Sequence, residues 1–250
     1  MTKKKEEEVE ATGTAMETQY GYFDDRPDYL KDESARGQEN VSVDDLTIPR
    51  LGLVQDLSPQ RKKTKPEYIE GAESGMLFNN VTSELYGTSM VFVPVYFKKE
   101  WCIWKSQSSG GGFEGAWPSE GEAVEAFVKR EFEGKMDEKG NPMYEIVDMA
   151  QHFGMVLHED RRPEEIVISM SKSKMKVSRQ LNTLVKMSGG DRFSRVYKIS
   201  AVEDQNKEGQ DYYNFGVAPL GYVSEPVYNL AAVMYESVSS GEKNANRDAG

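Results

Sequence analysis

The sequence predicts an α+β fold in which mainly antiparallel strands form a small, closed or half-closed β-barrel with about three helices. Three observations lead to this prediction. About seven segments are rich in β-branched and aromatic residues and end at turn residues, as strands do. About three other segments repeat apolar residues at helical spacing. Asn206–Gly209, between the last two expected strands, has the composition of a hairpin turn.

The chain is expected to form one folded domain between two tails. Its 250 residues suit a single large domain. Residues 1–45 contain thirteen acids and six bases and show little periodicity, so they are predicted to be a disordered acidic tail. This tail could act as an internal competitor for a basic surface, or it could only keep the protein soluble. The predicted domain spans 46–240, and a flexible C-terminal tail spans 241–250.

The expected strands follow from composition and from the positions of proline. Three prolines prevent the stretch Leu46–Glu73 from forming one long helix. The longest strand-like run contains Pro94, which predicts an edge position or a bulge there. Strands are expected at 76–78, 85–87, 90–105, 144–157, 165–170, 195–202 and 212–218.

The expected helices follow from caps and apolar spacing. Ser119 with Glu122 three residues later forms a capping box, after a loop at 106–116 that contains three consecutive glycines. Pro226 suits the first turn of the last helix, which opens at Ser224. Helices are expected at 119–132, 172–188 and 224–238.

A basic segment, Ser171–Ser200, stands out in an acidic chain. It contains eight bases and one acid, whereas the whole chain carries a net charge of −11. In a helix over 172–188, the apolar residues lie roughly opposite one stripe, which is formed by Lys172, Lys176, Arg179, Thr183 and Lys186. Gly189 and Gly190 then predict the helix end. Such a helix packs its apolar face on a core and presents its charge to an anionic partner, or it is only a solvated surface helix.

Binding of single-stranded nucleic acid requires cations along the backbone and aromatic faces for the bases. The strand at 90–105 carries large apolar residues on both faces, so one face is core and the other is a stacking platform or also core. A proline-flanked loop at 61–65 adds a second basic cluster. The candidate cations are Lys172, Lys176, Arg179, Lys186, Arg192, Arg195, Lys198, Arg61, Lys62, Lys63 and Lys65, and the candidate aromatic residues are Trp101, Trp104, Tyr96, Tyr197 and Tyr213.

Several function classes are not supported. The sequence contains no G-x-S-x-G, HExxH or CxxC motif, so no enzyme activity, cofactor or metal site is expected. Cys102 lies in an aromatic strand and is expected to be buried rather than to form a nucleophile with His152. A single cysteine excludes an internal disulfide and fits a reducing cytoplasm. No apolar run is long enough for a membrane span, and the first residues do not resemble a secretory signal.

The residues at 46–75, at 91–105 and at 171–186 together resemble a group of tailed-phage proteins associated with single-stranded DNA binding in replication and recombination modules. The resemblance covers roughly residues 42–238. It implies an OB-like barrel and single-stranded DNA as the partner. Phage single-strand binders often end in an acidic tail, whereas this chain carries its acidic tail at the N-terminus.

The resulting expectation is a phage protein of the host cytoplasm that binds single-stranded DNA without strong sequence preference. Phage replication or recombination proteins and a second copy of the chain are possible further partners. Two alternatives remain open: a phage structural or assembly protein whose basic surface docks an acidic subunit, and an annealing protein that forms rings on DNA.

Overall fold

The structure, a computed structural model, describes residues 36–37, 39–40, 48–159 and 161–241. The predicted acidic tail lies outside the described residues apart from four positions between 36 and 40, and the predicted C-terminal tail lies outside them apart from Gly241. Every element below belongs to the compact unit Ser42–Gly250. Within the described residues this unit is α+β, with three α-helices and antiparallel sheets, as predicted.

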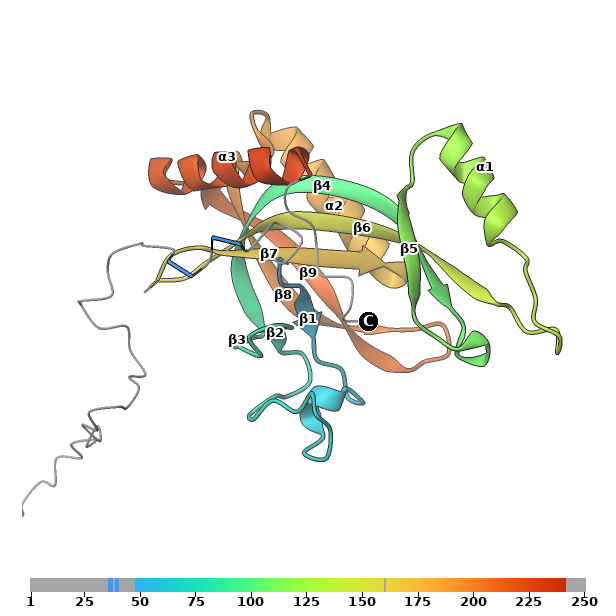
Figure 1. The fold of residues 1–250 in the computed structure, drawn as a ribbon. Coiled ribbons are helices and arrows are strands. Elements are labelled where there is room, and N and C mark those ends of the chain that lie inside the picture. Colours follow the sequence, from blue (N-terminus) through green and yellow to red (C-terminus); the bar gives the residue numbers. More distant parts are fainter. Residues whose placement is uncertain (1–35, 38, 41–47, 160, 242–250) are drawn as a thin grey trace, which may run out of the picture. The chain divides into compact units, whose positions relative to one another are not determined.

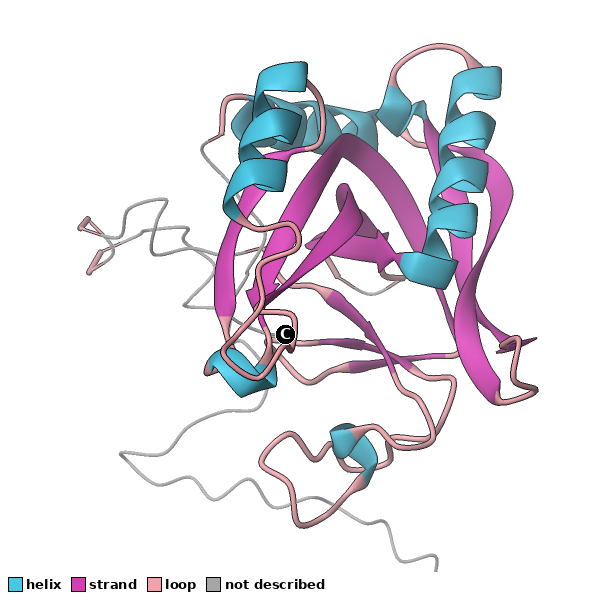
Figure 2. Ribbon diagram, turned by 90° about the vertical axis from the view of Figure 1, so that its right-hand side faces the viewer, coloured by secondary structure: helices cyan, strands magenta, loops and turns pink. Residues whose placement is uncertain are grey.

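The described strands form two sheets, the larger of which is strongly curved (Figures 1 and 2). Its order is β7-β6-β4-β8-β9, with β5 paired to one end of β4, and the smaller sheet has the order β1-β2-β3. The strands are β1 Leu51–Leu53, β2 Leu77–Asn79, β3 Leu85–Gly87, β4 Ser89–Lys105, β5 Phe113–Pro118, β6 Tyr144–Leu157, β7 Glu164–Ser171, β8 Arg195–Gln205 and β9 Asp211–Tyr222.

β4 is the strand around which the larger sheet is built. Its 17 residues pair with β6 from Val91 to Lys105. On the opposite edge β8 pairs at Ser89–Phe92 and β5 pairs at Glu100–Trp104. The run of β-branched and aromatic residues suits a long strand with packed faces. The register shifts between Pro94 and Tyr96, which confirms the irregularity predicted at this proline.

Helices cover both faces of the larger sheet (Figure 2). In β7, Ile166 and Ile168 belong to the core that includes Leu181 of α2, whereas Val167 belongs to the core that includes Met234 of α3. Successive strand residues point to opposite faces, so α2 and α3 lie on opposite faces. The helices are α1 Glu122–Glu131, α2 Met175–Ser188 and α3 Glu225–Ser239.

The larger sheet does not close into a barrel within the described residues. Its edge strands, β7 and β9, are not paired with each other. Arg50 instead forms a parallel bridge with Val167 of β7. The Gln55 side chain donates to the Tyr213 carbonyl of β9 at 2.9 Å and accepts from the Tyr213 N–H at 2.8 Å. The segment around β1 therefore contacts both edges, and the sheet remains curved and open.

The predicted capping box at Ser119 is wrong. The Ser119 N–H donates to the Lys99 carbonyl at 3.0 Å, so this residue continues the pairing of β5 with β4. α1 begins at Glu122, after Gly121 with φ +105°, and has no side-chain cap. The glycine loop expected at 106–116 includes a 3-10 turn and the start of β5. Strand pairing supplies backbone partners that the local sequence pattern does not reveal.

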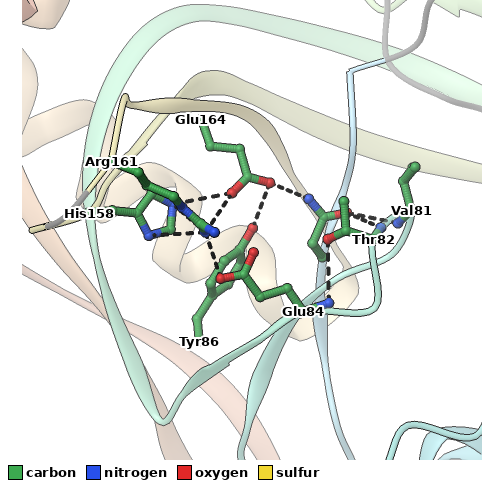
Figure 3. Close-up of polar contacts among 8 residues, drawn as sticks. Val81, Thr82, Glu84, Tyr86, His158, Arg161 and Glu164 are labelled. Carbon is green, nitrogen blue, oxygen red and sulfur yellow. Dashed lines mark hydrogen bonds and ion pairs between the residues drawn. The ribbon is translucent and has the colours of Figure 1, made fainter. Parts of the chain in front are cut away.

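A polar network joins the two sheets around Glu164 at the start of β7 (Figure 3). Glu164 Oε1 accepts from the Tyr86 hydroxyl at 3.0 Å and from Asn79 Nδ2. Glu164 Oε2 lies 3.2 Å from His158 Nε2 and accepts from Arg161 Nη2 at 3.4 Å. Burial raises the pKa of Tyr86 above its usual range, so the hydroxyl stays protonated and donates.

The rest of this network is also satisfied internally. Asn79 is fully buried, and its Oδ1 accepts from the N–H groups of Val81 and Thr82. Arg161 Nη2 donates to Glu84 Oε1 at 2.5 Å. Because both oxygens of the central carboxylate and the buried amide already have partners, we assign the network a structural role that fixes the smaller sheet to the larger one.

Replacing Glu164 by glutamine is expected to destabilise the fold by about 1.5–3 kcal/mol. In one orientation, the new amide nitrogen would face the Arg161 guanidinium, so that a donor meets a donor. In the flipped orientation, it would face the donors of Tyr86 and Asn79. Urea denaturation followed by circular dichroism measures the change. Glu208→Gln, in the exposed β8–β9 turn, is the control and should stay within about 0.5 kcal/mol of the unmodified protein. Equal losses in the two variants would contradict the role given to Glu164.

Candidate nucleic-acid interface

α2 presents a basic face because its apolar residues share the other face. Val177 and Leu181 are buried in the core beneath the helix, and Leu184 and Val185 pack against that core. Lys172–Lys174 form a 3-10 turn rather than the first turn of the predicted α-helix. The helix ends at Gly189, with φ +67°, as predicted. Packing of the apolar face therefore fixes which way the cations point.

The exposed cations of α2 are Lys176, Arg179 and Lys186. None of them forms an ion pair with an acid among the residues that the structure describes. Lys172, in the preceding turn, contacts Glu145 at 2.8 Å on an exposed surface. A hydrogen bond from Asn214 lowers the pKa of Asp204, and Lys176 lies near enough to this carboxyl to lower its pKa further. The three helix cations therefore form a positive surface without a close ion pair among the described residues; we call this surface the α2 stripe.

Arg195 and Tyr222 form a stacked pair beside the C-terminal end of α2. The guanidinium lies 4.8 Å from the centre of the Tyr222 ring and donates to Ser188 Oγ of α2 at 3.1 Å. Tyr222 is nevertheless 73% exposed, so much of its ring is accessible. The sequence analysis did not select Tyr222. Tyr222 is the residue of β9 opposite Arg195, a pairing that depends on the register of the two strands and not on a local sequence pattern.

Arg192 is held inside the protein by neutral acceptors. Its Nη2 donates to His152 Nδ1 and to Asn182 Oδ1, each at 2.9 Å, and the guanidinium lies over the Phe97 ring. Burial lowers the pKa of Arg192 to about 10. Burial, with the adjacent guanidinium, lowers the pKa of His152 to about 3, so this histidine is neutral at pH 7. Arg192 is therefore a half-buried cation without a carboxylate partner among the described residues.

Tyr197 and Lys198 do not join the α2 stripe. Tyr197 is fully buried, which leaves its ring no face for a base and corrects its place among the stacking candidates. Tyr197 and Ile199 both belong to the core beneath α2. The exposed side chain of Lys198, between them, therefore points to the opposite face of the sheet.

The second basic cluster lies on an exposed turn. Arg61 ends a 3-10 helix, Pro59–Arg61, and contacts the Asp56 carboxylate at 3.4 Å. The following three lysines of the cluster are exposed: Lys62, Lys63 and Lys65. A groove near the start of α2 is lined by Gln55, Asp56, Leu57, Ser173, Lys174, Asp211, Tyr212 and Tyr213. Through Asp56, the Arg61 end of this cluster is therefore brought close to the N-terminal end of α2.

One aromatic–cation contact and one tyrosine–carboxylate hydrogen bond involve residues that line that groove. Lys174 Nζ lies 4.7 Å from the centre of the Phe215 ring, and burial lowers the pKa of Lys174. Tyr213 is half-buried and donates from its hydroxyl to Glu203 Oε1 at 3.2 Å. Of the predicted aromatic residues, Tyr213 is the one that lines the groove near the start of α2.

The remaining aromatic candidates lie elsewhere. Trp101 packs against the core that includes Ile103. Trp104 is half-buried on the other side of β4 and packs edge-on against Phe113, 5.0 Å between ring centres. Tyr96 packs on the α3 side of the sheet, against Phe153 and Tyr235. The structure therefore does not bring these three rings to the α2 stripe.

Cys102 and His152, weighed in the sequence as a nucleophile and its base, have other contacts in the structure. Cys102 is buried, and its sulfur lies 3.9 Å from the Met149 sulfur. His152 is engaged with Ser178 and Arg192. Among these residues, no group of three or more histidine, cysteine, aspartate or glutamate side chains is placed to hold a metal ion. No described helix is both long enough and apolar enough to span a bilayer.

Comparison with known proteins gave one match. A family model described as Pam3 phage gp34-like protein matches residues 15–244, which is nearly the whole chain. No curated protein and no solved structure matches the chain.

Proposed function

The chain belongs to the family of Pam3 phage gp34-like proteins, and from the surface of α2 we propose that it binds single-stranded DNA in phage replication or recombination. The single observation that carries this proposal is the α2 stripe with its stacked pair. Exposed cations without an ion pair among the described residues run along the helix, and an exposed tyrosine supported by Arg195 lies at its end. Cations that follow a backbone and rings that accept bases are the two requirements of single-strand binding.

The same geometry favours little sequence preference along α2. Lysine and arginine that contact phosphates carry no base information. An OB-like origin of the curved sheet, host cytoplasm as the location, and replication proteins or a second copy as partners are parts of the same proposal. The proposal gives the protein no catalytic role and no cofactor.

Titration of a fluorescently labelled oligo(dT) of about 20 nucleotides, at two salt concentrations, tests the proposal. Binding should weaken as salt rises, because each phosphate contact contributes about 0.7 to the slope of log affinity against log salt. A double-stranded oligonucleotide of the same length serves as the comparison and should bind less tightly, because its bases are not free to stack. Absence of binding at about 0.05 M salt would overturn the proposal.

Replacing Tyr222 by alanine is expected to weaken oligo(dT) binding about tenfold, because stacking contributes about 1–3 kcal/mol per base. The salt slope should not change, since no phosphate contact is removed. Tyr222→Phe keeps the ring and should retain most of the affinity. Equal affinities of the alanine variant and the unmodified protein would show that this ring does not contact bases.

A second function has a specific observation in its favour. Met187, next to Lys186, is 80% exposed, and Leu220 on β9 is also exposed. Apolar side chains beside exposed cations suit a protein partner with an acidic, partly apolar surface, as in a phage structural or assembly protein. Met187→Ser separates the two functions. It should leave oligo(dT) binding unchanged if DNA is the partner.

A further inference from the structure

A groove lies between α3 and the turn that follows α2. Its lining comes from three places: Val95 of β4, residues 190–193 of the turn, and Tyr228, Ala232, Tyr235 and Glu236 of α3. On α3 the lining positions are separated by four, three and one residues, so they share one side of the helix. This groove is not the α2 stripe and contains none of its cations.

The wall of the groove is aromatic. The centre of the Phe193 ring lies 4.9 Å from that of Tyr228 and 6.1 Å from that of Tyr235. Tyr235 also packs against Tyr96, yet 39% of Tyr235 remains exposed. The neighbouring rings hold the Tyr235 ring in place while one part of it stays accessible. A flat apolar ligand could therefore lie against a ring that is already ordered.

The polar groups that the groove offers a ligand are carboxylates. Arg192 lines it, but its guanidinium donates to His152 and Asn182 and lies over Phe97, and its Nε is buried. Asp191 and Glu236 line the groove too. One oxygen of Asp191 accepts from the Tyr228 hydroxyl, and no described donor occupies the other. Two carboxylates disfavour a phosphate. A heterocycle with donors for a carboxylate suits the same groove.

We propose that this groove holds one unstacked nucleobase of the bound single strand, with its ring against Tyr235. The proposal rests on the function proposed above. Guanine has the edge that fits best, because it offers donors at N1 and N2 to a carboxylate such as Asp191. Contacts between the cations of the α2 stripe and the phosphates of the strand would hold the strand without regard to sequence. This groove would add a preference for one base at one position.

A backbone contact links the stacked pair at the end of α2 to the segment that lines the groove. The Val223 N–H, next to Tyr222, donates to the Ser194 carbonyl at 3.2 Å. Ser194 ends the 3-10 helix Arg192–Ser194, which begins at the groove. The stacked pair at the end of α2 and the groove therefore lie on either side of one short turn.

Anisotropy titrations with three labelled oligonucleotides test the inference: oligo(dT), the same strand with one central guanine, and the same strand with a central abasic site. The unmodified protein should bind the guanine strand about tenfold more tightly than the abasic strand. Tyr235→Ala, which removes the ring, and Ala232→Trp, which fills the groove, should each abolish this ratio and leave the salt slope unchanged.

Val233→Ala is the matched control, because Val233 is exposed on α3 but does not line the groove. It should keep the ratio. Circular dichroism establishes that each variant is folded, and photocrosslinking of an iodinated base in the unmodified protein, read by mass spectrometry, should label Tyr228 or Tyr235. Binding of all three strands with equal affinity, or crosslinks only outside the groove, would overturn the inference and leave the proposed function standing. Absence of any binding would overturn both.

Discussion

Replacing Lys176, Arg179 and Lys186 together by alanine should remove much of the affinity for single-stranded DNA. Three lost phosphate contacts lower the salt slope by about 2, at about 0.7 per contact. When the salt concentration rises from about 0.05 M to about 0.2 M, both proteins lose affinity for the oligonucleotide. The fold-loss should be about 20 times smaller for the triple variant than for the unmodified protein. Titrations of labelled oligo(dT) at four salt concentrations measure the slope. These three residues point away from the core, so the variant should keep its stability.

A charge-matched variant separates local contacts from net charge. Lys129→Ala, Arg130→Ala and Lys135→Ala remove three cations that lie on or just after α1 and pair with Glu125 or Glu131. Each triple variant changes the net charge from −11 to −14. The α1 variant should keep the unmodified salt slope. Identical slopes in the two triple variants would refute the assignment of the α2 stripe, because net charge alone would then explain the loss.

Replacing Leu181 by alanine should destabilise the fold by about 2–5 kcal/mol. Leu181 is fully buried on the apolar side of α2, where it packs into the core of the larger sheet. The truncation loses transfer free energy and leaves a cavity that the helix cannot fill without moving. Urea denaturation and thermal melting measure the change.

Thr183→Ala, on the exposed side of the same helix, is the control for this truncation. The Thr183 hydroxyl donates back to the Arg179 carbonyl at 2.8 Å, and alanine is a good helix former, so the change should stay within about 0.5 kcal/mol. Under conditions where Leu181→Ala remains folded, its salt slope for oligo(dT) should equal that of the unmodified protein. A small stability loss would mean that α2 is only loosely attached to the sheet.

The sequence predicted those features that depend on local pattern. The helical period placed Leu181 in the core and Arg179 at the surface, because both follow from spacing along one helix. Pro94 predicted the irregularity in β4, because proline cannot donate to a neighbouring strand. The glycine after α2 predicted its end, because that position requires a positive φ.

The features that the sequence did not reveal depend on pairing between distant segments. Tyr197 looked like a stacking candidate, and only the packing of β8 beneath α2 shows that it is buried. Tyr222 lies opposite Arg195 in the register of β8 and β9, including a shift after Val196 that no local pattern announces. The basic helix could therefore be proposed from sequence, whereas its aromatic partner could not.

The place of β4 at the centre of the larger sheet has a consequence for how the chain is made. Met90 of β4 pairs with Ile199 of β8, a partner about 110 residues later in synthesis. At about 5–20 residues per second, a ribosome needs roughly 5–20 s to produce that partner. Until then the Ser89–Phe92 part of this edge of β4 has no native neighbour, and its unpaired backbone groups can pair with other nascent chains. High expression rates should therefore favour aggregation, and slower translation between β4 and β8 should improve the yield of folded protein.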